Sequence, residues 1–184
     1  MRLFVAFLLS DEARALLRTL RAGLSRFDAD VRWTVPEQWH VTVKFLGDMP
    51  DRDVSVVGEA LVEGAKEASP FRMTVGGTGC FPPRGPVRIV WAGAADESGG
   101  MDNAVKSIQV PLEACGFPPE NRPWTGHITV GRVQQDRSGD RLRDAVAALP
   151  MGTVAQDIDS VTLMASALSP RGATYSKVQT VTLG

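Results

Sequence analysis

One short pattern occurs twice in this 184-residue chain, and it contains both of the chain's histidines. The segment Pro36-x-x-x-His40-Val41-Thr42-Val43 returns 87 residues later as Pro123-x-x-x-His127-Ile128-Thr129-Val130. This separation is close to half the chain, whereas the rest of the two halves matches only as alternating strand-like and helix-like segments. The repeat therefore predicts two similar lobes facing each other across a cleft, a common location for a binding site.

Length and composition narrow the class of protein further. A chain of this length with 43% hydrophobic residues is expected to form one domain, 1–184, around a substantial core. A net charge of -1 and a pI near 6.1 argue against a protein that coats nucleic acid through bulk charge. An anionic ligand would therefore be held by a local cluster of charge.

The apolar start of the chain, Leu3 to Leu9, resembles a signal peptide only superficially. The run has seven residues and is followed by Asp11 and Glu12, so we interpret it as a buried first strand. No other apolar stretch approaches the roughly 18 residues needed to span a bilayer. We expect a soluble cytoplasmic protein without a membrane partner, and a monomer by default.

Hydrophobic periodicity and turn residues indicate that strands and helices alternate. This pattern, with a hairpin-like final pair of strands, predicts an α+β or α/β fold with antiparallel pairing. Strands are expected at 3–9, 31–35, 40–46, 71–78, 87–92, 127–133, 158–168 and 175–183, and helices at 10–27, 48–68, 97–115 and 138–149.

The repeated motif has a consistent meaning on a strand. Alternate side chains point the same way, so His40 and Thr42 share one face while Val41 and Val43 share the other. The second copy follows the same rule. Each motif would anchor its apolar face in the core and present an imidazole and a hydroxyl to another surface. If the two strands lie together, four polar groups converge.

Two imidazoles and two hydroxyls suit proton transfer around a phosphorus centre. Imidazole has an ordinary pKa of about 6.5, so one ring can take a proton from a nucleophile while the other protonates a leaving oxygen. The hydroxyls of Thr42 and Thr129 can hold the non-bridging oxygens. A metal site is the main rival, but Glu37 is the only further carboxylate within segments 36–47 and 123–133, so we expect no metal.

Four neighbouring residues are candidate substrate contacts. Arg132 follows His127 by five positions and needs a bulge to reach the histidine face; a surface ion pair is the alternative. Lys44 falls on the His40 face by alternation and could reach a phosphate or cap a strand edge. Trp39 and Trp124 could stack a base, although core packing is the commoner role of tryptophan.

The paired motifs resemble the two His-x-Thr-x signatures of the two-histidine (2H) phosphoesterase superfamily. The likeness is closest to its RNA 2',3'-cyclic phosphodiesterases, also called LigT-like 2'-5' RNA ligases, and it covers nearly the whole chain. The segments that carry it, besides the motifs themselves, are Met1 to Ala6, Val31 to Gly47, Val87 to Gly93 and Arg122 to Arg132.

The resemblance implies a bilobal, pseudo-symmetric α+β fold, in which antiparallel sheets flank a central cleft and helices lie outside. It also implies hydrolysis of a 2',3'-cyclic phosphate on an RNA end or nucleotide to a 2'-phosphomonoester, without metal or other cofactor. In this family pattern His40 would donate a proton to the leaving 3' oxygen and His127 would accept one from water. Some members also join RNA ends by the reverse 2'-5' reaction.

Two alternatives remain open at this point. Another branch of the superfamily acts on ADP-ribose cyclic phosphate or on 2'-5' oligonucleotides. A non-catalytic module that binds RNA ends is the other alternative, but the four intact His and Thr positions disfavour it, because simple phosphate binding calls for permanent cations rather than titrating imidazoles.

Overall fold

The computed structural model describes residues 1–25, 30–119, 123–136, 140–169 and 172–184. Its strands form two antiparallel sheets, and each sheet contains one of the two motif strands. The first sheet has the order β3 (His40–Asp48), β1 (Arg2–Leu8), β8 (Ser160–Ser169) and β9 (Gly172–Thr182). The second has the order β2 (Asp30–Trp33), β6 (His127–Gln135), β5 (Ile89–Ala95), β4 (Phe71–Phe81) and β7 (Val154–Ile158).

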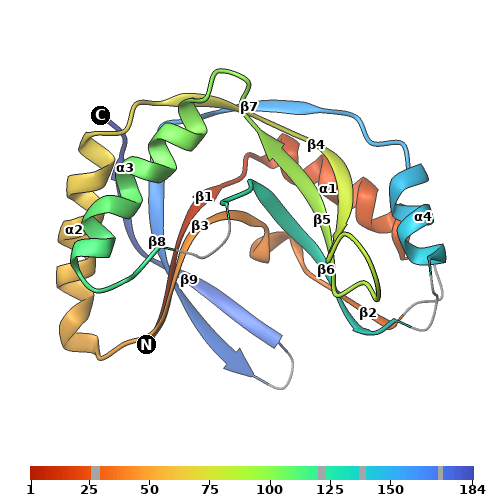
Figure 1. The fold of residues 1–184 in the computed structure, drawn as a ribbon, viewed down its shortest axis with the longest axis horizontal. Helices are drawn as coiled ribbons and strands as arrows, with labels where there is room; N and C mark the ends of the chain where they lie inside the picture. The colour runs from red at the N-terminus through yellow and green to blue at the C-terminus, as the bar shows by residue number, and fades with distance from the viewer. Residues whose placement is uncertain (26–29, 120–122, 137–139, 170–171) are drawn as a thin grey trace.

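The helices lie outside the two sheets, as Figure 1 shows. On one side α2 (Val54–Lys66) packs against α3 (Gly100–Ala114) and contacts β8 and β9. On the other side α1 (Asp11–Leu24) contacts β7, and α4 (Arg141–Ala148) contacts β4. Two 3-10 turns, η1 (Pro36–Gln38) and η2 (Asp51–Asp53), precede β3 and α2. The expected α+β fold with antiparallel sheets is confirmed.

The first two elements form for reasons visible in the sequence. The run Leu3 to Phe7 is fully buried on β1, because this strand has neighbours on both edges and is covered on both faces. Ser10 then caps α1 by accepting a hydrogen bond from the Ala13 amide at 3.1 Å. The predicted end of this helix near Phe27 and the predicted start of the fourth helix at Ser138 lie outside the described residues.

The predicted strand 158–168 is wrong in one respect, since the structure divides this region between two sheets. β7 belongs to the second sheet and β8 to the first, with only Asp159 between them. The polar residue Gln156 obscures β7 in the sequence. Its side chain is nonetheless buried, because its amide bonds the Leu8 carbonyl at 3.0 Å and the Ser10 amide at 2.8 Å.

Within the described part of the chain, no helix is both long enough and apolar enough to cross a membrane.

Candidate active site

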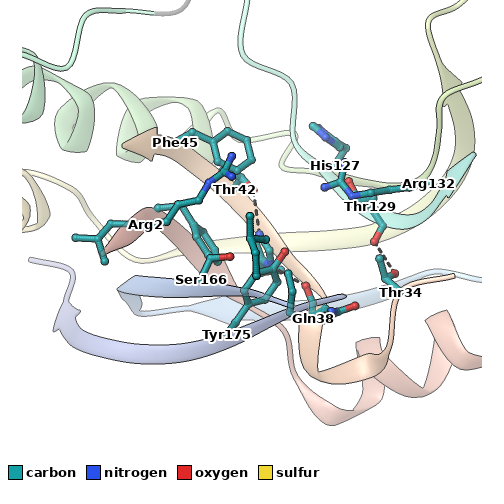
Figure 2. Close-up of a pocket in the computed structure, with 15 residues that line it drawn as sticks. Arg2, Thr34, Gln38, Thr42, Phe45, His127, Thr129, Arg132, Ser166 and Tyr175 are labelled. Atoms are coloured by element: carbon teal, nitrogen blue, oxygen red, sulfur yellow. Dashed lines mark hydrogen bonds between the residues drawn. The ribbon is translucent and has the colours of Figure 1, made fainter. Parts of the chain in front are cut away.

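Both motifs line one pocket of about 410 Å³ that lies between the two sheets. In Figure 2, His127, Thr129 and Arg132 lie on one side of it, opposite Phe45 and Tyr175. The predicted convergence of two imidazoles and two threonine side chains is therefore present in the structure. The lining consists of Arg2, Leu3, Phe4, Thr34, Gln38, His40, Thr42, Phe45, His127, Thr129, Arg132, Ser166, Leu168, Ala173 and Tyr175.

The two motif strands contain the same irregularity at the same place. The pairing of β3 with β1 skips Val43, and the pairing of β6 with β5 skips Val130. Each valine is the fourth residue of its motif and forms a bulge, which restarts the alternation of faces. As a result the fifth residue after each histidine returns to the pocket face. That residue is Phe45 on β3 and Arg132 on β6.

The His40 imidazole is held from both ring nitrogens. Nδ1 lies 2.7 Å from the Gln38 carbonyl oxygen, which only accepts, so Nδ1 carries a proton. Nε2 lies 3.0 Å from the Thr42 hydroxyl and faces the pocket. The ring also packs against Phe4, with ring centroids 4.7 Å apart, and edge-on against Tyr175 at 5.4 Å.

Burial among these rings lowers the pKa of His40 from 6.5 to about 4. The hydrogen bond to the Gln38 carbonyl acts in the opposite direction, and the positive charges of Arg132 and His127 add to the lowering. At neutral pH, His40 is therefore an uncharged imidazole whose Nε2 accepts a hydrogen bond from the Thr42 hydroxyl.

The His127 imidazole repeats one half of this arrangement. Its Nδ1 lies 2.9 Å from the carbonyl oxygen of Thr125, again the residue two positions earlier, so Nε2 is the nitrogen available for chemistry. The ring packs edge-on against Phe81 with centroids 5.1 Å apart. No described residue bonds its Nε2. The two histidines thus share a backbone anchor but differ in their surroundings.

Arg132 lines the pocket, and the bulge that this placement required is present at Val130. Its exposed guanidinium supplies a permanent positive charge beside the two histidines. This group is suited to a phosphate, because it presents several N–H donors in a fixed plane.

The predicted placement of Lys44 on the His40 face is wrong. The bulge at Val43 turns this residue toward the core, where its side chain is 2% exposed. The ammonium group donates a hydrogen bond to the Pro118 carbonyl at 2.5 Å. Lys44 therefore ties β3 to the segment that leads toward the second motif, and it does not line the pocket.

The predicted base-stacking role of Trp39 and Trp124 also has no support in the geometry. Trp39 is 1% exposed, and its Nε1 donates to the Thr34 hydroxyl at 2.8 Å. Trp124 packs against the core and donates from Nε1 to the Thr42 carbonyl at 2.9 Å. Neither indole lines the pocket, so neither ring is available to stack on a ligand there.

The sequence alone did not identify several pocket residues. Phe45 is 60% exposed at the pocket, and the bulge that places it there has no obvious sequence signal beyond the repeat itself. Arg2 and Phe4 come from β1, and Tyr175 comes from β9. Their positions depend on pairing between distant strands, which periodicity does not reveal.

The arrangement as a whole offers two titratable nitrogens, two hydroxyls and one guanidinium around a shared space. Among the described residues, no group of three or more His, Cys, Asp or Glu side chains is placed to hold a metal ion. Such a set is suited to moving two protons around an anionic tetrahedral centre.

Comparison with known proteins agrees with this chemistry. Residues 8–91 match the family described as LigT like Phosphoesterase. The RNA 2',3'-cyclic phosphodiesterase of Methanothermobacter thermautotrophicus is 29% identical over 179 residues, which cover 97% of this chain and 96% of that protein. The protein of the same name from Thermus thermophilus is also 29% identical, over 100% of this chain and 90% of its own length.

Solved structures show the same fold. A crystal structure of a Thermus thermophilus protein superposes with a TM-score of 0.79 at 27% identity, covering 100% of this chain and 98% of the other. Escherichia coli LigT in its apo form gives a TM-score of 0.76 at 22% identity, over 99% of this chain and 96% of its own.

Proposed function

We propose that the chain is an RNA 2',3'-cyclic phosphodiesterase of the LigT-like phosphoesterase family, which forms a 2'-phosphomonoester. One observation carries this proposal above the others. Two histidines from different sheets are each fixed through Nδ1 by a backbone carbonyl, so that both Nε2 atoms are left for the same pocket. Acid and base functions need this arrangement, whereas phosphate binding alone does not.

The reaction requires two proton transfers and one displacement at phosphorus. The cyclic phosphate is an anion, which Arg132 and the hydroxyls of Thr42 and Thr129 would hold through its non-bridging oxygens. His127 Nε2 takes a proton from water as the water oxygen attacks phosphorus. The bond from phosphorus to the 3' oxygen breaks, and His40 Nε2 protonates that oxygen. The phosphate remains on the 2' oxygen.

The donor role of His40 requires that the substrate alter its protonation. The pKa of about 4 leaves the ring neutral at pH 7, a state that suits a base. A bound phosphate anion favours the cationic ring and offsets the charge of Arg132, so His40 takes up a proton as substrate binds. Assignment of the donor role to His40 rests on the family resemblance, and a substrate with an altered leaving group separates the two roles.

The product isomer and the metal requirement test the activity. Purified protein is incubated in EDTA with 2',3'-cyclic AMP and with an RNA oligonucleotide that ends in a cyclic phosphate, and the products are identified by 31P NMR. We expect 2'-phosphate in both cases. A 3'-phosphate product, or no turnover without added metal, would contradict the proposal.

A substrate panel then tests the proposed class. ADP-ribose 1'',2''-cyclic phosphate and a 2'-5' linked oligonucleotide are compared with cyclic-phosphate RNA by kcat/KM. The RNA substrate is expected to give the highest value. Tight RNA-end binding without turnover of any of them would instead identify a binding module.

A further inference from the structure

Beside each motif bulge, backbone carbonyls accept hydrogen bonds from side chains that lie outside the strands of the sheet. On β3 the Thr42 carbonyl accepts from Trp124 Nε1 at 2.9 Å, and the Val43 carbonyl accepts from Gln109 Nε2 at 3.0 Å. β3 is an edge strand, so these carbonyls have no neighbouring strand to bond. The two side chains replace the missing strand at the position where the bulge turns two consecutive carbonyls outward.

β6 carries the matching arrangement. The carbonyls of Thr129 and Val130 both accept from the Thr34 hydroxyl, at 3.0 and 2.7 Å, and Figure 2 shows Thr34 beside Thr129. The Val130 carbonyl also accepts from the Thr34 amide at 2.9 Å. The Thr34 oxygen in turn accepts from Trp39 Nε1 at 2.8 Å, so its proton is directed at the two carbonyls.

These contacts cross from one motif to the other. Trp124 lies three residues before His127 but bonds the threonine of the first motif. Trp39 lies directly before His40 and, through Thr34, bonds the threonine of the second motif. Each tryptophan therefore connects the start of its own motif to the bulge of the opposite one.

We propose that Trp39 and Trp124 are positioning residues, whose indole N–H groups set the separation of the two histidine strands. The proposal rests on the proposed function, because that separation matters only if both imidazoles act on one phosphate. A displacement of about 1 Å in a reacting group can cost on the order of 10²-fold in rate. Rotation or sliding of either strand would break a crossed hydrogen bond before the rings moved that far.

Replacement of one N–H tests this role. Trp124→Phe keeps a large aromatic ring and removes the donor to Thr42, and Trp39→Phe does the same toward Thr34. Each is expected to lower kcat about 10- to 100-fold while KM for 2',3'-cyclic AMP changes less than about threefold. Trp91→Phe is the matched control, because the Trp91 Nε1 is buried without a partner among the described residues and the ring does not line the pocket.

A second pair of variants separates hydrogen bonding from packing. Thr34→Val removes the hydroxyl at nearly constant volume and should lower kcat as Trp39→Phe does. Thr34→Ser keeps the hydroxyl, so its kcat should be close to that of the parent protein. The proposal is overturned if Trp39→Phe and Trp124→Phe keep kcat within about twofold of the Trp91→Phe value, or if Thr34→Ser is as slow as Thr34→Val.

A readout without turnover distinguishes this failure from failure of the proposed function. The imidazole 15N and 1H signals of His40 and His127 are recorded for each variant with inorganic phosphate present. Trp124→Phe should shift the His40 signals, although residue 124 belongs to the other motif, whereas Trp91→Phe should leave them unchanged. An inactive parent protein would refute the phosphodiesterase, and unshifted His40 signals would refute the positioning role.

Discussion

β3 and β6 each bring a histidine, a threonine and, after a bulged valine, a third side chain into one pocket, but the third side chain is Phe45 on β3 and Arg132 on β6. The residues directly before these two also differ. Lys44 is buried, and Gly131 occupies the matching position on β6. A side chain there would not fit, since a Cβ on Gly131 would lie 2.7 Å from Val31 Cγ1.

The surroundings of the two imidazoles also differ. His40 is enclosed by Phe4 and Tyr175, and burial there lowers its pKa to about 4. Among the described residues, His127 has one aromatic neighbour, Phe81. The motif therefore fixes the direction of each ring through a carbonyl two residues earlier, while separate elements of the fold supply the neighbours around it. Duplicated backbone geometry can therefore support two different chemical roles.

The largest expected effect comes from removing either imidazole. His40→Ala and His127→Ala should each lower kcat by about 10²- to 10⁴-fold, because each removes one proton transfer. Circular dichroism should show an unchanged fold. If either variant keeps near-full activity, the assignment of these two histidines as an acid and a base is wrong.

A substrate with sulfur in place of the bridging 3' oxygen separates the two roles. A thiolate leaves without protonation, so this substrate should restore much of the kcat of His40→Ala but not that of His127→Ala. Rescue of His127→Ala alone would show that the roles are reversed. The low pKa of His40 would then explain why His40 acts as the base. Because both assignments need one charged and one neutral ring, a bell-shaped pH profile cannot distinguish them.

The next effect should come from Arg132. Arg132→Ala removes a charged hydrogen-bond donor from the phosphate, a contact of about 1.5 to 3 kcal/mol, so kcat/KM should fall by about 10- to 100-fold. Arg132→Lys should recover part of this loss by retaining the charge. If Arg132→Ala binds inorganic phosphate as well as the parent protein does, the phosphate contact is wrong.

Phe45 should give a smaller effect of a different kind. Stacking of a base on an aromatic ring contributes about 1 to 3 kcal/mol, so Phe45→Ala should raise KM for a cyclic nucleotide by about tenfold. Because the side chain is 60% exposed, the melting temperature should change little. Affinity for inorganic phosphate serves as the control, since it has no base. Equal loss for phosphate and nucleotide would contradict a stacking role.

The smallest effect concerns stability against pH. The pKa of His40 is lower in the folded state than its ordinary 6.5, so the unfolded chain binds a proton first as the pH falls. This group therefore favours folding above pH 6.5, and its contribution is lost progressively toward pH 4. Between pH 8 and 6 the loss should be about 1 kcal/mol in the free energy of unfolding. His40→Gln should unfold with a correspondingly flatter pH dependence in urea titrations.

The sequence predicted much of this fold because its strongest signals are local. The buried run on β1, the cap at Ser10 and the repeated motif all depend on residues close together in the chain. The convergence of His40 and His127 could be predicted because both residues occur in the same short motif. The bulges change which face of the strand the following side chains occupy. Lys44 therefore lies in the core and Phe45 lines the pocket.

Features that depend on long-range pairing could not be predicted in the same way. The aromatic enclosure of His40 requires Phe4 and Tyr175 to meet across the first sheet. The positions of the tryptophans beside the motifs suggest candidate stacking platforms, because nothing local indicates that Trp124 bonds the strand of the opposite motif. Strand register, rather than residue type, decides such contacts.

The single residue between β7 and β8 limits how the cleft can change shape. Ile158 ends a strand of the second sheet and Ser160 begins one of the first, so the two sheets are joined there by Asp159 alone. One residue spans at most about 3.6 Å, so the sheets cannot separate at this point. Any change in the width of the cleft must therefore be smallest beside Asp159 and larger at positions farther from it.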